Sequence, residues 1–327
     1  MGDSENQQKM DITRLVEEYR GKTVEDIFSN HRILRNPMGQ FFKIHWEIKD
    51  ITFHFDLSRT KKRLLENLKV VDYIGKTTEK DLLRKDVKTI DDLKTNLLYG
   101  TSAKEIWDLI EKRDYITLNQ IKDIYDIDLL FCFELKDLLF LDIETLGLYN
   151  NPIIMVGIGY YIDTKFIIFQ FLARDLEEEI SICEHLRKEI FPAFKCFITY
   201  NGKSFDIPYL ANRFLYFFDK NPMVYKSEFI EGNISKFHHI DLYHNCRRIY
   251  KNQFSKYSLT TIEKNLLACK RTNDLPSNMI ASYYQKYLKN PKKYAGLVKI
   301  IVEHNFQDIQ SMPLILDKLL NSYENLD

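Results

Sequence analysis

Two acidic residues, Asp142 and Glu144, end an unbroken apolar run at residues 138–141 near the middle of the chain. A short apolar run of this kind is typical of a buried β-strand. Side chains at positions i and i+2 of a strand point to the same face, so both carboxylates would project together from the end of that strand. The pair could hold a metal ion there, although an Asp-x-Glu sequence after an apolar run is also common in strands without a catalytic role.

A third acid, Asp206, follows a second apolar segment at residues 197–200 and an Asn-Gly pair. Ser204 is a suitable N-cap for the amphipathic helix that we expect over residues 204–218. That helix would carry Asp206 in its first turn, facing the strand ends. An acid in the first turn also complements the helix dipole, so Asp206 by itself has two explanations.

A histidine and a fourth acid, His304 and Asp308, lie four residues apart in a segment with helical apolar periodicity. If the segment is helical, both side chains lie on one face of the helix. A pair at this spacing is also an ordinary surface contact. It therefore gains meaning only in combination with the three acids that precede it.

The four acids occur in the order and sequence contexts of the DEDD 3′→5′ exonuclease superfamily, which has the RNase-H-like fold. Over about residues 138–320 the chain resembles that superfamily, and within it the YprB-type ribonuclease-H-like domain. The segments that carry the resemblance, besides the acids, are residues 156–161, 200–206, 239–242, 257–259, 271–276 with Tyr283, Tyr284 and Tyr287, and 303–305. The resemblance implies an α/β fold with an RNase-H-like mixed sheet flanked by helices.

The resemblance also implies a metal site and a general base. The metal ligands would be Asp142, Glu144, Asp206 and Asp308, holding two Mg²⁺ or Mn²⁺ ions, with His304 as the general base. Oxygen ligands suit these ions better than zinc or copper, and two such ions can activate water and stabilise the leaving oxygen of a phosphodiester. A neutral histidine can accept a proton near neutral pH.

One departure from the wider superfamily concerns this base. Its two main branches place a His five residues, or a Tyr four residues, before the last Asp. Here a His stands at the four-residue spacing, as in the YprB-type branch. The geometry around His304 therefore cannot be transferred from either main branch.

Residues around the acids are expected to contact the substrate or to support the site. The expected substrate contacts are Tyr200, Asn201, Lys203, Tyr257 and Arg271, of which Tyr200 could equally belong to the core. Asp241 lies on a short expected strand, where a supporting role at the rim fits better than metal binding. His238 and His239 would point to opposite faces of that strand, which argues against a metal cluster with His244.

The chain carries no net charge, but its charge is unevenly distributed. Between residues 234 and 299 there are 13 Lys and Arg residues and only three acids. The aromatic residues interleaved with them are Tyr243, Tyr250, Phe254, Tyr257, Tyr283, Tyr284, Tyr287 and Tyr294. Such a mixture suits contact with a nucleic-acid backbone and stacking on bases. The alternative is a solvated helical face with buried aromatic residues.

Composition indicates a globular protein with a sizeable core, because 45% of the 327 residues are hydrophobic. The five cysteines are widely spaced and form no Cys-x-x-Cys motif of a zinc or redox site. The polar start at residues 1–6 has no apolar signal core. No apolar run approaches the length of about 18 residues that a membrane span needs. We therefore expect a cytoplasmic protein without a membrane partner.

Local patterns predict the elements of the carboxyl-terminal half. Strands are expected at residues 138–144, 153–162, 165–171, 194–200 and 238–242, and helices at 176–190 and 204–218, with mostly helical structure after that. The order of antiparallel strands, helix, strand, helix and strand is the RNase-H-like arrangement. We assign residues 135–327 to this domain.

Residues 1–134 are expected to form a smaller, mostly helical accessory region. Alternating aromatic residues within 38–55 suggest one or two strands that pack on the nuclease domain. Residues 70–95 resemble a helix-hairpin-helix unit, in which backbone N–H groups of a Gly-containing hairpin can bind a phosphate, although Tyr73 stands where the first hairpin glycine is usual. A purely structural helical pair is an equal alternative. Further helices are expected at 103–112 and 118–125.

The residues and the resemblance together predict a metal-dependent nuclease that hydrolyses phosphodiester bonds of DNA or RNA by a two-metal mechanism. Its direction, 3′→5′ exonuclease action on single-stranded 3′ ends, follows from the resemblance alone. One alternative is a catalytically inactive nucleic-acid-binding adaptor of a repair or RNA-processing complex, which the presence of all four acids disfavours. Another is a nucleotide phosphatase, which the basic segment disfavours.

Overall fold

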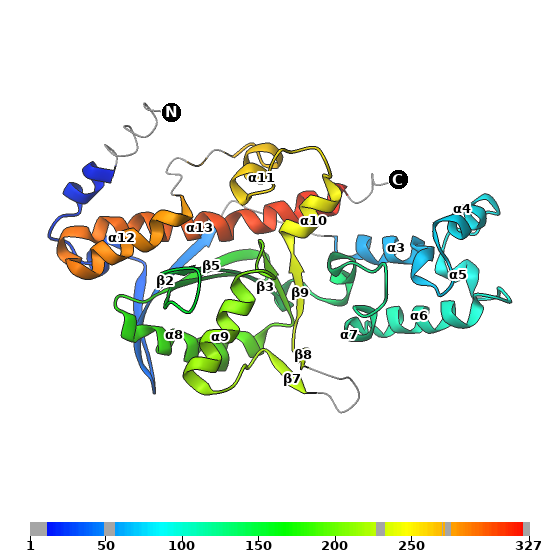
Figure 1. Ribbon diagram of the computed structural model, residues 1–327, viewed down its shortest axis with the longest axis horizontal. Coiled ribbons are helices and arrows are strands. Elements are labelled where there is room, and N and C mark those ends of the chain that lie inside the picture. The colour runs from blue at the N-terminus through cyan, green and yellow to red at the C-terminus, as the bar shows by residue number, and fades with distance from the viewer. Residues whose placement is uncertain (1–11, 49–55, 227–232, 270, 272–275, 323–327) are drawn as a thin grey trace.

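The fold is built on a seven-stranded mixed sheet with helices on both faces (Figure 1). The computed structural model describes residues 12–48, 56–226, 233–269, 271 and 276–322. Three consecutive antiparallel strands, β3 (Leu138–Thr145), β4 (Ile153–Ile162) and β5 (Lys165–Leu172), are followed by β6 (Cys196–Thr199) and β9 (His238–Asp241), which run parallel to β3. The sheet order is β1-β2-β5-β4-β3-β6-β9. The expected α/β fold is confirmed, and so is the expected succession of antiparallel strands, helix, strand, helix and strand along the chain.

The sheet also contains two strands from the amino-terminal part of the chain. They are β1 (His31–Asn36) and β2 (Gly39–Ile48), and β2 pairs antiparallel with β5 from Phe42 opposite Leu172 to Ile48 opposite Phe166. Phe42 and Ile44 are fully buried at alternate positions, which is why this segment pairs as a strand. The expectation of strands in 38–55 that pack on the nuclease domain is confirmed for 39–48, and residues 49–55 lie outside the described residues.

One face of the sheet is covered by two helical segments. The first is the run of η4 (Leu176–Glu178), α8 (Glu179–His185) and the π-helical turn η5 (Leu186–Ile190), and the second is α9 (Asp206–Phe218). Leu139, Leu141 and Ile143 of β3 point into this core. The helix expected from Ser204 begins instead at Asp206. Ser204 is not its N-cap, because residues 201–204 still form a turn in which the Ser204 N–H donates to the Asn201 carbonyl.

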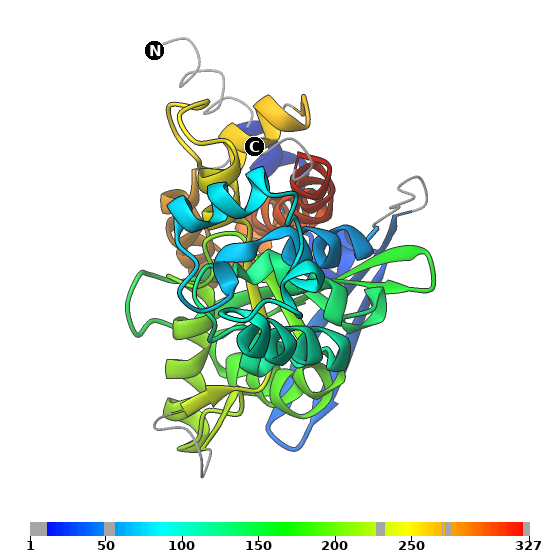
Figure 2. The same cartoon turned by 90° about the vertical axis from the view of Figure 1, so that its right-hand side faces the viewer.

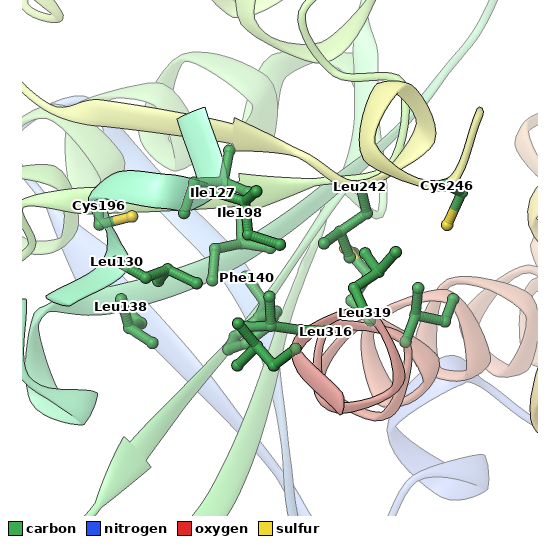
Figure 3. Packing of buried hydrophobic residues seen from close by; sticks show 14 of the residues in the cluster. Ile127, Leu130, Leu138, Phe140, Cys196, Ile198, Leu242, Cys246, Leu316 and Leu319 are labelled. Atoms are coloured by element: carbon green, nitrogen blue, oxygen red, sulfur yellow. The ribbon is translucent and has the colours of Figure 1, made fainter. Parts of the chain in front are cut away.

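The other face is covered by the last four helices, which are α10 (Leu242–Ile249), α11 (Leu259–Leu266), α12 (Ser277–Lys289) and α13 (Pro291–Ser322). Leu138 and Phe140 of β3 point towards Leu316 of α13 on this side (Figure 3). Because side chains alternate along a strand, Asp142 and Glu144 also belong to the face that α13 covers. The mostly helical structure expected for the end of the chain is confirmed.

Two glycines of β4 allow α13 to approach the sheet closely. A Cβ atom at Gly157 would lie 2.1 Å from Asn305 Oδ1, and one at Gly159 would lie 2.8 Å from Ile309 Cγ2. Asn305 and Ile309 are four residues apart on α13, so both glycines lie under one face of that helix. The absence of side chains at these two positions sets the distance between the helix and the acids of β3.

The amino-terminal helices form a separate lobe at one end of the molecule (Figure 1), and this lobe faces the viewer in Figure 2. They are α3 (Ser58–Glu66), η1 (Leu68–Val70), α4 (Lys76–Arg84), α5 (Ile90–Leu93), α6 (Gly100–Lys112) and α7 (Tyr115–Leu118), after the short α2 (Val24–Ile27). The helix expected at 118–125 is wrong, because α7 ends at Leu118 and Asp123 has a positive φ of 66°. Within the described part of the chain no helix is long and apolar enough to cross a membrane.

The lobe joins the sheet through η2 (Asp126–Cys132) and η3 (Leu135–Asp137). Ile127 and Leu130 of η2 pack beside Leu138 and Ile198 of the sheet (Figure 3). The boundary that we place at residue 134 stays a prediction, and the hydrophobic core continues across it. A small hairpin of β7 (Val224–Lys226) and β8 (Asn233–Ser235) completes the described structure.

The expected hairpin at residues 70–75 is a turn between η1 and α4. Tyr73 has a φ of 65° and is 93% exposed. A positive φ is the conformation that glycine adopts most readily, and Tyr73 stands where the first hairpin glycine would be. Gly75 occupies the N-cap of α4. Nucleic-acid binding by this unit stays a prediction.

Candidate functional site

The four acids and the histidine singled out in the sequence line one cavity. Its volume is about 490 Å³, and it lies where the end of β3, the first residue of α9 and the middle of α13 meet. The lining residues are Asp142, Ile143, Glu144, Thr145, Gly147, Leu148, Tyr200, Asn201, Phe205, Asp206, Asn278, Ala281, His304 and Asp308. Segments more than 160 residues apart in the sequence therefore converge on one cavity.

Three of these side chains are close enough to share one metal ion. The His304 Nε2 atom lies 3.9 Å from Glu144 Oε1 and 3.5 Å from Asp308 Oδ2. One ligand atom from each of the three residues lies within 4.8 Å of the other two. The expectation that His304 and Asp308 share one helical face is confirmed, because both are buried on the side of α13 that faces β3.

Hydrogen bonds hold the other two carboxylates. Asp206 is buried, and its Oδ1 accepts from the backbone N–H of Ile143 at 3.0 Å. The Asp142 Oδ2 atom accepts from the side-chain amide of Asn305 at 2.7 Å. The first bond holds the start of α9 against the end of β3, and the second holds α13 against β3. Both carboxylates are thereby fixed in position.

The electrostatics of the cavity favour a bound cation. Loss of solvent, followed by the negative charge of Asp308, raises the pKa of Asp142 and of Glu144 well above the ordinary carboxyl value. Burial raises the pKa of Asp206 to about 7, and neighbouring Asp241 and Asp308 add to this effect. Ionised acids that are buried together repel one another. A divalent cation would relieve the repulsion, so the oxygen-rich set of ligands fits Mg²⁺ or Mn²⁺.

Arg271 lies beside the acids but does not line the cavity. Its Nε and Nη2 atoms each lie 2.6 Å from a carboxylate oxygen of Glu263, Nη2 also pairs with Asp308, and Nη1 lies 3.4 Å from His304 Nδ1. The guanidinium therefore holds a metal-ligand candidate rather than facing the substrate space. The neighbouring residues 272–275, which also carry the family resemblance, lie outside the described residues.

The other expected substrate contacts divide into two groups. Tyr200 and Asn201 line the cavity. Lys203 does not, because its Nζ atom pairs with Asp126 at 2.5 Å, and Tyr257 lines a different cavity. The structure therefore places Lys203 outside this cavity, where Asp126 of η2 holds its ammonium group, and its contact with the substrate stays a prediction. That acid could not be assigned to Lys203 from sequence.

Asp241 supports the loop that carries Tyr200 and Asn201. It is fully buried, and its carboxylate accepts from the backbone N–H groups of Asn201 at 2.8 Å, Lys203 at 3.0 Å and Tyr243 at 3.0 Å. This agrees with a supporting role near the rim.

The histidines of β9 point to opposite sides of the strand. His238 Nε2 lies 2.7 Å from the Asp126 carbonyl oxygen, whereas His239 Nε2 lies 2.9 Å from Thr199 Oγ1. Among the described residues these histidines form no candidate metal cluster.

A buried polar chain behind the site was missed by the sequence reasoning. The indole N–H of Trp46 donates to Gln170 Oε1 at 2.8 Å, and the Gln170 amide donates to Asn305 Oδ1 at 2.9 Å. Asn305 in turn donates to Asp142. Asn305 directly follows His304 within the segment that carries the resemblance, which was its only signal. Nothing in the sequence connects it to Trp46 on β2 or Gln170 on β5.

Fold and site together define an α/β protein of the RNase-H-like class with clustered acids at the end of its central strand. A family model described as the RNase_H superfamily matches residues 139–320. This is more than half of the chain, and the chain belongs to that superfamily. Membership suggests a nuclease-like function with a nucleic-acid substrate.

A curated relative supports the finer resemblance. The chain is 28% identical over 180 residues to the uncharacterized protein YprB of Bacillus subtilis (strain 168). The matched region covers 54% of this chain and 40% of that protein. The chain therefore matches less than half of the length of this relative.

Proposed function

We propose that this protein is a metal-dependent nuclease that hydrolyses phosphodiester bonds of DNA or RNA and acts as a 3′→5′ exonuclease. The observation that carries the proposal is the convergence of four carboxylates and a histidine on one cavity of an RNase_H-superfamily domain. The direction of digestion rests on the resemblance to the DEDD exonucleases.

The metal ligands in this proposal are Asp142, Glu144, Asp206 and Asp308. Two bound Mg²⁺ or Mn²⁺ ions would supply an activated water and charge stabilisation at the leaving oxygen. The raised pKa values of Asp142 and Glu144 support the assignment. Ionised carboxylates buried in one cavity destabilise the folded protein unless a bound cation neutralises their charge.

His304 is proposed as the general base, since its Nε2 atom lies at the cavity beside Glu144 and Asp308. To accept a proton at Nε2, the neutral ring must carry its own proton on Nδ1. The Arg271 Nη1 atom approaches Nδ1 at 3.4 Å, so this contact must open in the active state. Arg271 then acts by holding Asp308 and Glu263 rather than by touching the substrate.

Tyr200, Asn201 and Leu148 are proposed to contact the terminal nucleotide, because they line the same cavity as the acids. Leu148 is 70% exposed and offers an apolar surface to a base. Asp241 fixes the backbone at Asn201. Together these residues would position the strand end against His304 and the carboxylates.

The test is digestion of 3′-labelled and 5′-labelled single-stranded DNA and RNA with Mg²⁺ or Mn²⁺. We expect metal-dependent release of nucleotides from the 3′ end, abolished by EDTA and by Asp142→Asn. As a matched control, Asp219→Asn removes an exposed carboxylate at the end of α9 and should leave the rate unchanged. Binding without cleavage under either metal would contradict the nuclease proposal and favour the adaptor function.

A further inference from the structure

A second cavity lies beside the end of α10, outside the carboxylate site. Its volume is about 390 Å³, and it is lined by His244, Arg247, Arg248, Lys251, Asn252, Phe254 and Tyr257. Four of these seven residues are basic, and none is a carboxylic acid. The catalytic cavity, in contrast, is lined by four acids. The two cavities therefore have opposite electrostatic character.

Part of the wall of this basic cavity is a loop that is held together by its own contacts. Tyr257 donates through Oη to the Tyr250 carbonyl at 2.5 Å, which closes the loop after α10. The Phe254 ring packs between Tyr250 and Tyr257, with ring centroids 5.8 Å apart in each pair. The loop thereby places Lys251 in the same cavity as the basic residues of α10.

Two of the basic groups have no acidic partner among the residues that the structure describes. Arg247 and Lys251 are exposed, and neither forms an ion pair with a described carboxylate. The Arg247 guanidinium lies 5.5 Å from the centroid of the Tyr243 ring. Arg248 is held by Asn245 at 2.8 Å and lies over the Tyr125 ring. An uncompensated positive charge in a concave surface attracts anions.

A hydrogen bond joins the walls of the two cavities. Tyr200 lines the catalytic cavity, and its Oη donates to the backbone carbonyl of Tyr257, which lines the basic cavity. The Tyr200 and Tyr243 rings also contact each other edge to face, with centroids 6.0 Å apart. An aromatic surface therefore extends from the acids towards Arg247.

We propose that the basic cavity binds backbone phosphates of the same nucleic-acid strand whose end enters the catalytic cavity. Arg247 and Lys251 contact the phosphates, and the Tyr243 ring, which contacts both Tyr200 and Arg247, offers a surface for base stacking. Guanidinium groups suit phosphate oxygens, and aromatic rings bind bases of any sequence. The proposal rests on the proposed nuclease function and adds a second, sequence-independent contact for the substrate.

The test is binding of a fluorescent 12-nucleotide single strand in EDTA, as a function of salt concentration. The double variant Arg247→Gln/Lys251→Gln should bind roughly tenfold more weakly, and the slope of log affinity against log salt should fall by about 1.4, because each lost phosphate contact on a single strand contributes about 0.7. The control Lys188→Gln/Lys220→Gln removes two exposed lysines from the opposite helical layer and should bind like the natural protein.

An unchanged affinity and salt slope in the Arg247/Lys251 variant would overturn the proposal, and so would absence of strand binding by the natural protein at low salt. Thermal melting checks that both double variants are folded. Because binding is measured without metal, a failure of the nuclease proposal shows itself separately, as intact substrate in the digestion assay.

Discussion

Asn305 connects the metal-ligand candidates to the interior of the sheet. Its amide donates to Asp142 while its carbonyl oxygen accepts from Gln170. The bond from Gln170 thus determines which end of the Asn305 amide faces the carboxylate. Loss of a residue that orients a metal ligand in this way typically weakens metal binding by about 10-fold to 100-fold.

We expect Asn305→Ala to weaken Mn²⁺ binding by about 10-fold to 100-fold, because Asp142 loses its hydrogen-bond donor. Isothermal titration with Mn²⁺ measures the effect without relying on activity. Asn265→Ala, which removes an exposed asparagine of α11, is the control and should bind normally. An Asn305→Ala protein with unchanged Mn²⁺ affinity would show that Asp142 needs no such support.

The raised pKa of Asp206 makes the metal-free protein sensitive to pH. Burial raises this pKa to about 7, above the unfolded value of about 3.9. The folded protein therefore holds a proton on Asp206 that the unfolded chain releases. The protonated Asp206 therefore contributes to the stability of the folded protein at low pH. This contribution is lost as the pH rises from about 4 through about 7.

In EDTA at pH 8, Asp206→Asn should accordingly be more stable than the natural protein, by on the order of 2 kcal/mol. One pKa unit corresponds to about 1.4 kcal/mol. The full shift is not assigned to Asp206, because its titration is coupled to that of the neighbouring acids. At pH 4 the two proteins should differ little. Urea unfolding at both pH values measures this, with Glu189→Gln as the control at an exposed acid. Equal loss of stability at both pH values would indicate a packing defect instead.

At the scale of the elements, the contact between α13 and β4 determines the geometry of the site. The helix approaches the strand where Gly157 and Gly159 have no side chains, and Asn305 and Ile309 occupy that space. Gly157 stands opposite Asp142 in the β3–β4 pairing. The glycines thus set how far His304 and Asp308 lie from the acids of β3.

Gly157→Ala should destabilise the protein by about 1–3 kcal/mol, because a Cβ 2.1 Å from Asn305 Oδ1 forces the helix or the amide to move. The same shift should weaken Mn²⁺ binding. Urea unfolding and Mn²⁺ titration measure the two effects. Gly75→Ala, where an added Cβ meets nothing within 4 Å, is the control for stability. A variant with native stability would mean that the helix packing tolerates the methyl group.

At the scale of the whole molecule, the RNase-H-like domain and the amino-terminal part share structure. Strand β2 pairs along β5 and supplies Trp46 to the polar chain behind Asp142. Asp126 of η2 pairs with Lys203 and accepts from the Asp241 N–H at 3.1 Å. The amino-terminal part therefore supports the site from both edges of the sheet.

We expect a fragment of residues 135–327 to unfold at lower urea concentration than the full chain, because it exposes β5 and the surface beneath η2. Urea unfolding followed by circular dichroism measures the midpoint. The full chain carrying Asp219→Asn, a change at an exposed residue, serves as the control and should unfold like the natural protein. A fragment with the midpoint of the full chain would show that the domain is independent of the first 134 residues.

Sequence patterns that act over a few residues determined the strands and the acid positions. The apolar runs at 138–141 and 153–162 became β3 and β4, because a short continuous apolar run suits a strand that is buried on both faces. The four-residue spacing of His304 and Asp308 put both on one helical face, because the helix repeats every 3.6 residues. These features depend on local backbone geometry, so the sequence alone was sufficient.

Tertiary structure decided which partners the polar side chains found. Lys203 turns to Asp126, Arg271 to Glu263 and Asp308, and Asn305 to Gln170 and Asp142. Most of these pairs join residues far apart along the chain, and each could form equally well with many other polar groups. Only the packing of α13 against β4, and of the amino-terminal lobe against β9, brings the actual partners within hydrogen-bonding distance.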